Sequence, residues 1–381
     1  MKKILMIGWE LPPFNSGGLG VACYYIASYL SKKTKLTFCL PKKLPINKVY
    51  FDLIFAEEEI KILKGYNDLK KYVPLEMFEE VLSYGPRLLA KIKKENIEFE
   101  IIHAHDWLSG LSGVYLKENL NKPLIIHIHS TEIERTGNNP NMVIYHIEKE
   151  ILQKADLVIS VSNLTKNIIN KYYEIPNDKI YTLYNGIDLN PTECELIPYI
   201  LKLKKEKYKI ILFVGRLVLQ KGPDYLLSTI KYVINYYPRV KYIFAGSGEM
   251  LEELIKKAYY ENLLDYVIFT GFLRDKNLWS LYSLSDVLVM PSVFDPFGLV
   301  ALEAVKFKLP IIISKTSGVG ENLNNCLKTD YWDIMKMANY IIGILKYEPL
   351  KNELTNNAFN ELSKFNWEDR VNRLLEIYQK I

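Results

Sequence analysis

The sequence predicts an α/β protein made of two successive doubly wound domains. Short apolar runs typical of buried strands alternate with amphipathic segments typical of helices, and this alternation occurs twice along the chain. Between the two arrays, residues 189–207 lose the alternation and contain prolines and mixed charge. With 381 residues, 49% of them hydrophobic, the chain is long enough to build two cores. We therefore expect one domain over residues 1–190 and another over residues 205–362.

The first array opens with an apolar strand, residues 4–7, and a glycine-rich turn. Further strands are expected at residues 36–40, 50–55, 100–107, 123–130, 155–161 and 179–183, with helices at 21–30, 75–94, 142–154 and 162–172. Asp106 and His129 stand at two strand ends, where open α/β sheets bind ligands, so both should face one crevice. His103 and His127 lie inside the same strands, and we expect hydrogen-bonded core residues there.

The second array repeats the pattern with five strands and ends in helices. Strands are expected at residues 209–214, 240–245, 266–270, 286–290 and 310–313, and helices at 223–236, from 250, at 278–284, 333–346, 350–362 and 367–381. The alternation indicates a second parallel sheet, and the two sheets place a site in a cleft between the domains.

The stretch from Pro291 to Glu303 joins a strand to a helix that begins near Gly298. Free N–H groups at the start of that helix favour an anion, and Glu303 lies about 8 Å farther along at ~1.5 Å per residue. One helix can thereby hold a phosphate at its end and a sugar hydroxyl on its flank. An ordinary strand–loop–helix explains the stretch equally well.

Arg216 and Lys221 lie on one strand–helix loop with glycines beside them. Either could be a solvated surface charge. Two fixed cations beside a helix terminus would instead hold a diphosphate without a metal ion, and the absence of an Asp-x-Asp pair from the sequence agrees with this. Asp295, at the turn, would face the group that is transferred.

Composition limits the classes of partner. The net charge of +5 is spread over both halves, which argues against nucleic acid. Four cysteines without a Cys-x-x-Cys pair, and five histidines without a recognised metal motif, predict neither a zinc site nor disulfides, and suggest a cytoplasmic protein. No apolar run reaches the ~18 residues of a membrane span. A basic amphipathic helix at residues 75–94 could touch a membrane, although a solvated face is the simpler interpretation.

The motifs together resemble the retaining glycosyltransferases of the GT-B fold, in the group that holds glycogen and starch synthases and family 4 glycosyltransferases. The matching stretches occur in the family's order: Gly17-Gly-Leu-Gly20, His103-Ala-His-Asp-Trp107, Ile126-His-Ile-His129, Asn185-Gly-Ile-Asp188, Val214-Gly-Arg216 with Lys221-Gly222, Ala245-Gly-Ser-Gly248, and Asp295-Pro-Phe-Gly-Leu-Val-Ala-Leu-Glu303. The resemblance implies two Rossmann-like domains with a cleft between them. It also implies that residues 363–381 form a helix that crosses back to the first domain.

The resemblance implies a role for each matched residue. Arg216 and Lys221 would bind the donor diphosphate and stabilise it as it leaves, and Glu303 would bind the ribose. Asp295 would bind hydroxyls of the transferred sugar, while His129 and Asp106 would contact that sugar or position the acceptor. The donor-binding set is Gly17, Gly18, Gly215, Gly246, Phe297, Gly298, Leu299, Val300 and Glu303. The resemblance implies neither a metal ion nor a cofactor.

Three departures bear on the substrate. The family's Glu-x7-Glu is here Asp295-x7-Glu303, the stretch Asn15-Ser-Gly-Gly18 lacks the lysine typical of glycogen synthases, and Ser317-Gly318 replaces a Gly-Gly pair. The first two favour the family 4 side.

We expect transfer of a hexose, glucose first, from UDP- or ADP-glucose to an α-glucan. A segment from His129 to Gly137 would form a loop on the acceptor side. The main alternative is a family 4 transferase for a lipid, a glycan or a small molecule, and a non-catalytic sugar-nucleotide module is a further one. A Rossmann dehydrogenase is disfavoured because no Gly-x-Gly-x-x-Gly opens a helix. No lysine lies in the context that a phosphorylase of this fold uses for pyridoxal phosphate.

Overall fold

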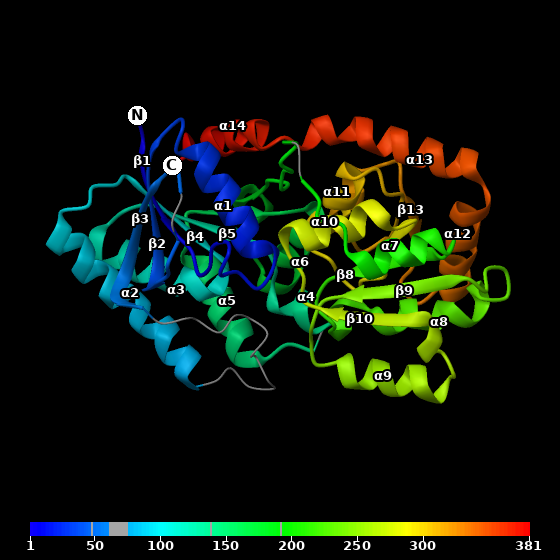
Figure 1. Cartoon of the computed structure of the whole chain (residues 1–381). Helices are drawn as coiled ribbons and strands as arrows, with labels where there is room; N and C mark the ends of the chain where they lie inside the picture. Colours follow the sequence, from blue (N-terminus) through cyan, green and yellow to red (C-terminus); the bar gives the residue numbers. More distant parts are fainter. Residues whose placement is uncertain (47–48, 61–74, 138, 191–192) are drawn as a thin grey trace. The chain divides into compact units, whose positions relative to one another are not determined.

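The chain forms two compact units in the computed structural model, which describes residues 1–46, 49–60, 75–137, 139–190 and 193–381. Unit 1 combines Met1–Gly186 with Trp367–Ile381, and unit 2 is Ile187–Asn366 (Figure 1). The break after Gly186 lies a few residues before the expected end of the first domain. The last helix belongs to unit 1.

Unit 1 is a parallel sheet with helices on both faces. Its strands are β1 (Lys3–Ile7), β2 (Lys35–Lys43), β3 (Asp52–Ile60), β4 (Ile101–His105), β5 (Leu124–Ile128), β6 (Leu157–Ser160) and β7 (Ile180–Thr182). Its helices are α1 (Gly18–Leu30), α2 (Leu75–Glu95), α3 (Asp106–Leu120), α4 (Glu132–Thr136), α5 (Met142–Lys154), α6 (Asn163–Tyr173) and α14 (Trp367–Tyr378). The strand order is β3-β2-β1-β4-β5-β6-β7. Successive strands are therefore added toward one edge of the sheet up to β3 and toward the other edge from β4 on. This reversal of strand order, between β1 and β4, is the point where such sheets bind ligands.

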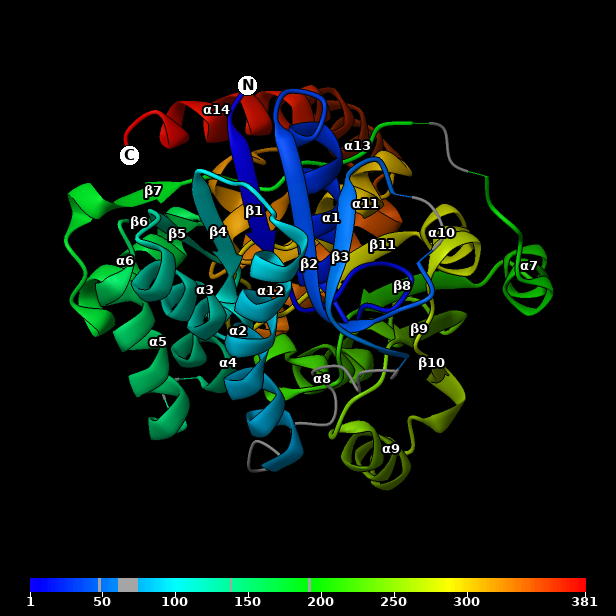
Figure 2. The same cartoon turned by 90° about the vertical axis from the view of Figure 1, so that its left-hand side faces the viewer.

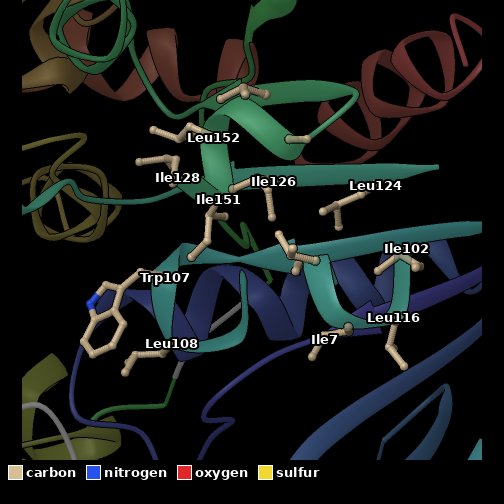
Figure 3. Close-up of a cluster of buried hydrophobic side chains, with 14 of the residues drawn as sticks. Ile7, Ile102, Trp107, Leu108, Leu116, Leu124, Ile126, Ile128, Ile151 and Leu152 are labelled. Carbon is tan, nitrogen blue, oxygen red and sulfur yellow. The ribbon is translucent and has the colours of Figure 1, made fainter. Parts of the chain in front are cut away.

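Alternate residues of the strands face two separate cores. Leu5 and Ile7 of β1 pack with α2, α3, α5 and α6, whereas Ile4 and Met6 pack with α1 and α14. Figures 1 and 2 show these two groups of helices on opposite sides of the sheet. Figure 3 shows part of the first core, in which side chains of β4, β5, α3 and α5 meet. A parallel sheet buried on both faces is the arrangement that near-continuous apolar strands predict.

The amphipathic helix expected at residues 75–94 is α2. Its apolar side chains, Val81, Tyr84, Leu88 and Ile92 among them, are buried in the first core of unit 1. The pattern that could have served a membrane surface therefore serves packing on the sheet. None of the helices that the structure describes has an apolar stretch long enough to span a bilayer.

Unit 2 repeats the architecture with a second parallel sheet. Its strands are β8 (Lys209–Val214), β9 (Val240–Ala245), β10 (Val267–Gly271), β11 (Val287–Met290), β12 (Ile311–Ser314) and β13 (Leu327–Thr329). Its helices are α7 (Pro198–Lys205), α8 (Pro223–Val233), α9 (Leu251–Tyr260), α10 (Asp275–Leu284), α11 (Leu299–Lys306), α12 (Ile334–Lys346) and α13 (Glu348–Glu361). The strand order is β10-β9-β8-β11-β12-β13. The reversal here lies between β8 and β11.

Two local expectations were wrong. The strand expected at residues 100–107 ends at His105, and Asp106 starts α3 with a φ of 53°. The expected linker at residues 189–207 contains α7, whose Lys204 Nζ lies 2.6 Å from Asp286 Oδ2. A buried carboxylate thus attaches the supposed linker to the second sheet.

Candidate active site

In unit 2 the two loops at the reversal point meet through an ion pair. Lys221 follows β8 and Asp295 follows β11, and Lys221 Nζ lies 2.9 Å from Asp295 Oδ2. Asp295 is only 5% exposed, and Ser292 Oγ lies 3.5 Å from the same carboxylate oxygen. Because β8 and β11 are paired neighbours, their following loops lie side by side. The structure thus brings together two of the residues expected to be catalytic.

Arg216 is oriented by a buried amide in the same loop. Its Nη2 donates to Gln220 Oε1 at 3.3 Å, and the backbone oxygen of Gln220 accepts a hydrogen bond from the backbone N–H of Phe294. Gln220 therefore connects the arginine to the loop that carries Asp295. The sequence analysis missed Gln220. Its position between two cations, Arg216 and Lys221, was the available signal.

The first turn of α11 offers backbone donors at this loop. Gly298 is the N-cap with a φ of 96°, and among the described residues no side chain caps the helix. Phe297 and Gly298 are buried, whereas Leu299 and Val300 are partly exposed. Uncapped N–H groups at a helix start favour an anion.

Glu303 lies farther along α11 and is held by a residue that the sequence analysis missed. Tyr282 of α10 donates from its Oη to Glu303 Oε2 at 2.8 Å. Burial raises the pKa of the Glu303 carboxyl, and the hydrogen bond from Tyr282 opposes that rise. The hydrogen bond from Tyr282 therefore orients the Glu303 carboxylate before any ligand binds.

Two glycines of these loops are required by close backbone packing. A Cβ on Gly222 would lie 2.2 Å from the Pro291 oxygen, and one on Gly246 would lie 1.9 Å from the Gly215 oxygen. Both have positive φ, 62° and 156°. We expected Gly246 to be a donor-binding residue, and its contact with Gly215 gives a sufficient structural reason for glycine at that position.

The loop after β12 also reaches Asp295. The backbone N–H of Gly318 donates to the backbone oxygen of Asp295 at 2.9 Å, and the backbone N–H of Asp295 donates to the backbone oxygen of Thr316 at 3.0 Å. The turn therefore forms although Ser317-Gly318 replaces the Gly-Gly pair of the family pattern. The loops after β8 and β11 thus contact the Asp295 carboxylate, and the loop after β12 holds its backbone.

In unit 1 a buried glutamate shapes the glycine turn. Glu10 Oε2 accepts hydrogen bonds from the N–H and Oγ of Ser16, both at 2.9 Å, and its Oε1 accepts from the Gly20 N–H at 3.3 Å. Gly17 and Gly18 are exposed at the start of α1. Sequence reasoning missed Glu10, although a carboxylate directly after an apolar strand is a usable signal.

Asp106 follows β4, at the reversal point of unit 1, and His129 follows the neighbouring strand β5. Asp106 Oδ1 accepts hydrogen bonds from the N–H groups of His129 at 2.6 Å and Ser130 at 3.4 Å. Burial raises the pKa of Asp106 to about 7, against a lowering by the Arg135 charge. Burial of the imidazole lowers the pKa of His129 to about 3, so its ring is neutral near pH 7. The residue remains partly exposed.

The segment after His129 is fixed by buried charges. Thr131 and Glu134 form a capping box at the start of α4, and Arg135 pairs with Glu132 and Glu148. Burial raises the pKa of Glu134 to about 7. This network of buried hydrogen bonds and ion pairs holds the segment after His129 in one defined conformation. An acceptor-side role for it stays a prediction.

Comparisons with protein families identify the family of this chain. A family model described as "Glycosyltransferase Family 4" matches residues 16–191, and one described as "Glycosyl transferases group 1" matches residues 201–361. The chain belongs to this glycosyltransferase family. Its members have the GT-B fold, use a nucleotide-sugar donor and retain the anomeric configuration, so this glycosyltransferase is an enzyme of that type.

Three comparisons place the glycosyltransferase among its relatives. It is 28% identical to an uncharacterized glycosyltransferase of Methanocaldococcus jannaschii over 99% of this chain and 98% of that one. It is 25% identical to the glycogen synthase of Mycobacterium tuberculosis over 85% of this chain and 80% of that one. The sucrose-phosphate synthase of Thermosynechococcus elongatus has the same fold, with a TM-score of 0.78, 21% identity and coverage of 100% and 99%. The fold and family expected from the sequence are confirmed, while the cleft and the individual residue roles stay predictions.

Proposed function

We propose that this glycosyltransferase moves glucose from UDP- or ADP-glucose to an α-glucan with retention, and that its chemical step needs no metal ion. The observation that carries the proposal is the Lys221–Asp295 ion pair, which lies just ahead of the uncapped start of α11. It supplies a fixed cation next to backbone donors, which is what a leaving diphosphate requires.

The proposed chemistry separates binding from charge stabilisation. Glu303, oriented by Tyr282, binds the ribose diol. Lys221 and Arg216 meet the charge that grows on the diphosphate as the bond from the sugar C1 to phosphate oxygen breaks. The acceptor oxygen attacks C1 from the same face, and its proton passes to the departing phosphate oxygen. Asp106 and His129 of unit 1 contact the transferred sugar or position the acceptor.

The α-glucan acceptor rests on the similarity to a glycogen synthase, which extends over 85% of this chain. One observation favours a different acceptor. Asn15 occupies the position at which glycogen synthases carry a lysine, and its Nδ2 donates to the Gly17 oxygen of its own loop at 2.9 Å. A side chain turned onto its own loop removes one cation from the glycine turn. We therefore keep a lipid, glycan or small-molecule acceptor as the second candidate.

A donor screen tests the proposal. The protein is incubated with UDP- and ADP-sugars, with and without glycogen, and nucleotide release and the linkage of the product are measured. Glycogen should stimulate release from one glucose donor and yield an α-linked product. Release without stimulation by glycogen would favour the second candidate. A protein that binds donors but never turns them over would be a sugar-nucleotide module.

A chelator tests the metal-free chemical step. Activity in EDTA should equal activity without it, because two fixed cations replace the ion. Full loss of activity in EDTA, restored by Mg²⁺ or Mn²⁺, would contradict this part of the proposal.

A further inference from the structure

Four of the five histidines gather on one face of the sheet in unit 1. His103 and His105 lie two residues apart on β4, and His127 and His129 follow the same spacing on and after β5. The strands are parallel neighbours with His105 opposite His127. The rings stack at centroid distances of 4.6 Å along β4 and 4.4 Å along β5. Residues two apart share a face, so register alone assembles this histidine cluster.

The histidine cluster has more nitrogen atoms than protein partners. His103 Nδ1 lies 2.6 Å from Tyr378 Oη, and His105 Nδ1 lies 2.9 Å from His129 Nε2. The Nε2 atoms of His103 and His105 and both ring nitrogens of His127 are buried without a hydrogen-bond partner among the described residues. Buried polar atoms are normally paired, so the unpaired Nε2 of His105, the one of these atoms that belongs to the site proposed below, can mark a ligand or ion. Neutral imidazole is also the form that binds metals.

Helix α1 brings a thiol to one end of the histidine cluster. A ligating atom of Cys23, one of His105 and one of His129 all lie within 4.8 Å of one another. Zinc takes tetrahedral ligands at about 2.0–2.1 Å for nitrogen and about 2.3 Å for sulfur, which sets ligands roughly 3.3–3.6 Å apart. The imidazoles of His105 and His129 already meet, with Nδ1 of the first 2.9 Å from Nε2 of the second, and these atoms would separate by about 0.4 Å to share an ion. The other distances, at most 4.8 Å, would shorten by no more than about 1.5 Å.

We propose that Cys23, His105 and His129 bind one Zn²⁺ ion, and that this ion inhibits the glycosyltransferase. Thiolate and imidazole are the ligands that zinc prefers, and three of them leave a fourth position for water. His129 is partly exposed, which gives the ion a way in. The inhibition, though not the binding, rests on the proposed function, because an ion would hold the His129 ring that is proposed to contact the sugar.

The neighbouring charges favour a cation here. The buried carboxyl groups of Asp106 and Glu10 interact electrostatically with Cys23. Acidic groups beside a site help to compensate the charge of a bound dication. The thiol proton leaves when the metal binds, so affinity should increase with pH.

Binding is measured on the full chain without any substrate. Zn²⁺ titrated by calorimetry should show one equivalent, and Co²⁺ should give a thiolate-to-cobalt charge-transfer band. Cys23→Ala should weaken binding at least tenfold and abolish the band. The matched control is Cys39→Ala, another fully buried cysteine of unit 1, which should bind as the wild type does. Absence of a wild-type equivalent, or equal binding by Cys23→Ala, would overturn the proposal. If Cys23→Ala does not fold, Cys23→Ser serves instead, with the same expected loss of the band.

Inhibition is measured separately with a donor that is turned over. Zn²⁺ at its binding concentration should stop the wild type and Cys39→Ala but leave Cys23→Ala active, and EDTA should restore the inhibited enzymes. Equal inhibition of Cys23→Ala would refute the inhibitory role. A chain inactive toward every donor would refute the proposed function, while the calorimetric result would still decide whether the zinc site exists.

Discussion

Asp295 is the residue at which this glycosyltransferase departs from the Glu-x7-Glu pattern, and its surroundings suggest a reason. Its carboxylate is buried and paired with Lys221, and the loop after β12 holds its backbone. A glutamate is one methylene longer and would displace this arrangement. We infer that the shorter side chain positions the lysine, in addition to or instead of binding sugar hydroxyls.

Replacement of Asp295 by Asn should lower kcat at least roughly tenfold and leave the Kd of the nucleoside diphosphate almost unchanged. The variant keeps hydrogen-bonding capacity but removes the charge that fixes Lys221. Steady-state kinetics and calorimetry on the same preparation make the comparison. The control is Ser292→Ala, because the Ser292 hydroxyl contacts the same carboxylate oxygen. This substitution should change kcat by less than about threefold. A rise in the donor KM alone would assign Asp295 to the sugar hydroxyls.

Tyr282 should act through Glu303. Tyr282→Phe removes one hydrogen bond to the carboxylate, worth about 1 kcal/mol, so the donor KM and the nucleotide Kd should both rise roughly fivefold with kcat little changed. Tyr242→Phe is the control, because its hydroxyl meets Thr229 in the core of unit 2. Equal effects of the two substitutions would show that Tyr282 matters only for folding.

The functional residues were predictable to different degrees. Arg216, Lys221, Asp295 and Glu303 lie within motifs whose local order carries chemical information. Partners such as Tyr282 were not predictable, because Tyr282 approaches Glu303 from 21 residues away through a packed helix. Long-range partners leave no periodic trace in one sequence.

At the scale of the element, strands and helices with a clear hydrophobic pattern in the sequence were predicted well. The strand over residues 209–214 and the helix over residues 142–154 have the expected bounds. Helix α3 was missed because Gly110 and Gly113 lower its apparent propensity. A Cβ on Gly110 would lie 2.8 Å from Ile151, and one on Gly113 would lie 2.8 Å from Leu124. Close packing on the sheet requires those glycines, so tertiary contacts overrode local preference.

A buried carboxylate, that of Asp286, links helix α7 to the first strand of the sheet in unit 2. Asp286 Oδ2 lies 2.6 Å from Lys204 Nζ and accepts from the Ile210 N–H at 2.8 Å. Asp286→Asn should reduce the free energy of unfolding by about 2 kcal/mol, because a buried ion pair loses one member. Urea unfolding measures this. Glu193→Gln breaks the exposed pair with Lys276 and should cost less than about 0.5 kcal/mol. Equal costs would show that α7 needs no ionic anchor.

At the scale of the molecule, the histidine cluster should make folding sensitive to acid. Burial lowers the pKa of His103 to about 3, and that of His105 and His127 well below the usual value of about 6.5. Below pH 6.5 the unfolded chain binds protons that the folded chain refuses, so stability falls as the pH falls. Asp106 and Glu134, with pKa values raised to about 7, act in the opposite direction and offset part of the loss.

His127→Leu isolates one such proton. Its ring nitrogens have no hydrogen-bond partner in the part of the chain that the structure describes, so the change should not destabilise the protein at pH 7.5. Below pH 6 the stability of this variant should fall less steeply than that of the wild type, by about 1.4 kcal/mol per pH unit. Urea unfolding at pH 7.5, 6 and 5 gives both slopes. His146→Gln, an exposed position on α5, should match the wild type throughout, and identical slopes for His127→Leu would contradict the account.

The return of the last helix to unit 1 has a consequence for biosynthesis. The second core of unit 1 is completed by side chains that the ribosome makes after all of unit 2: Trp367, Val371, Leu374, Ile377 and Tyr378. Unit 2 is continuous, and the Ile187 N–H bonds to the Phe365 oxygen at 2.7 Å, so its two ends close on each other. Unit 2 can therefore finish folding during translation. The second core of unit 1 stays incomplete until α14 has been synthesised. A premature stop before Trp367 would thus damage unit 1 rather than unit 2.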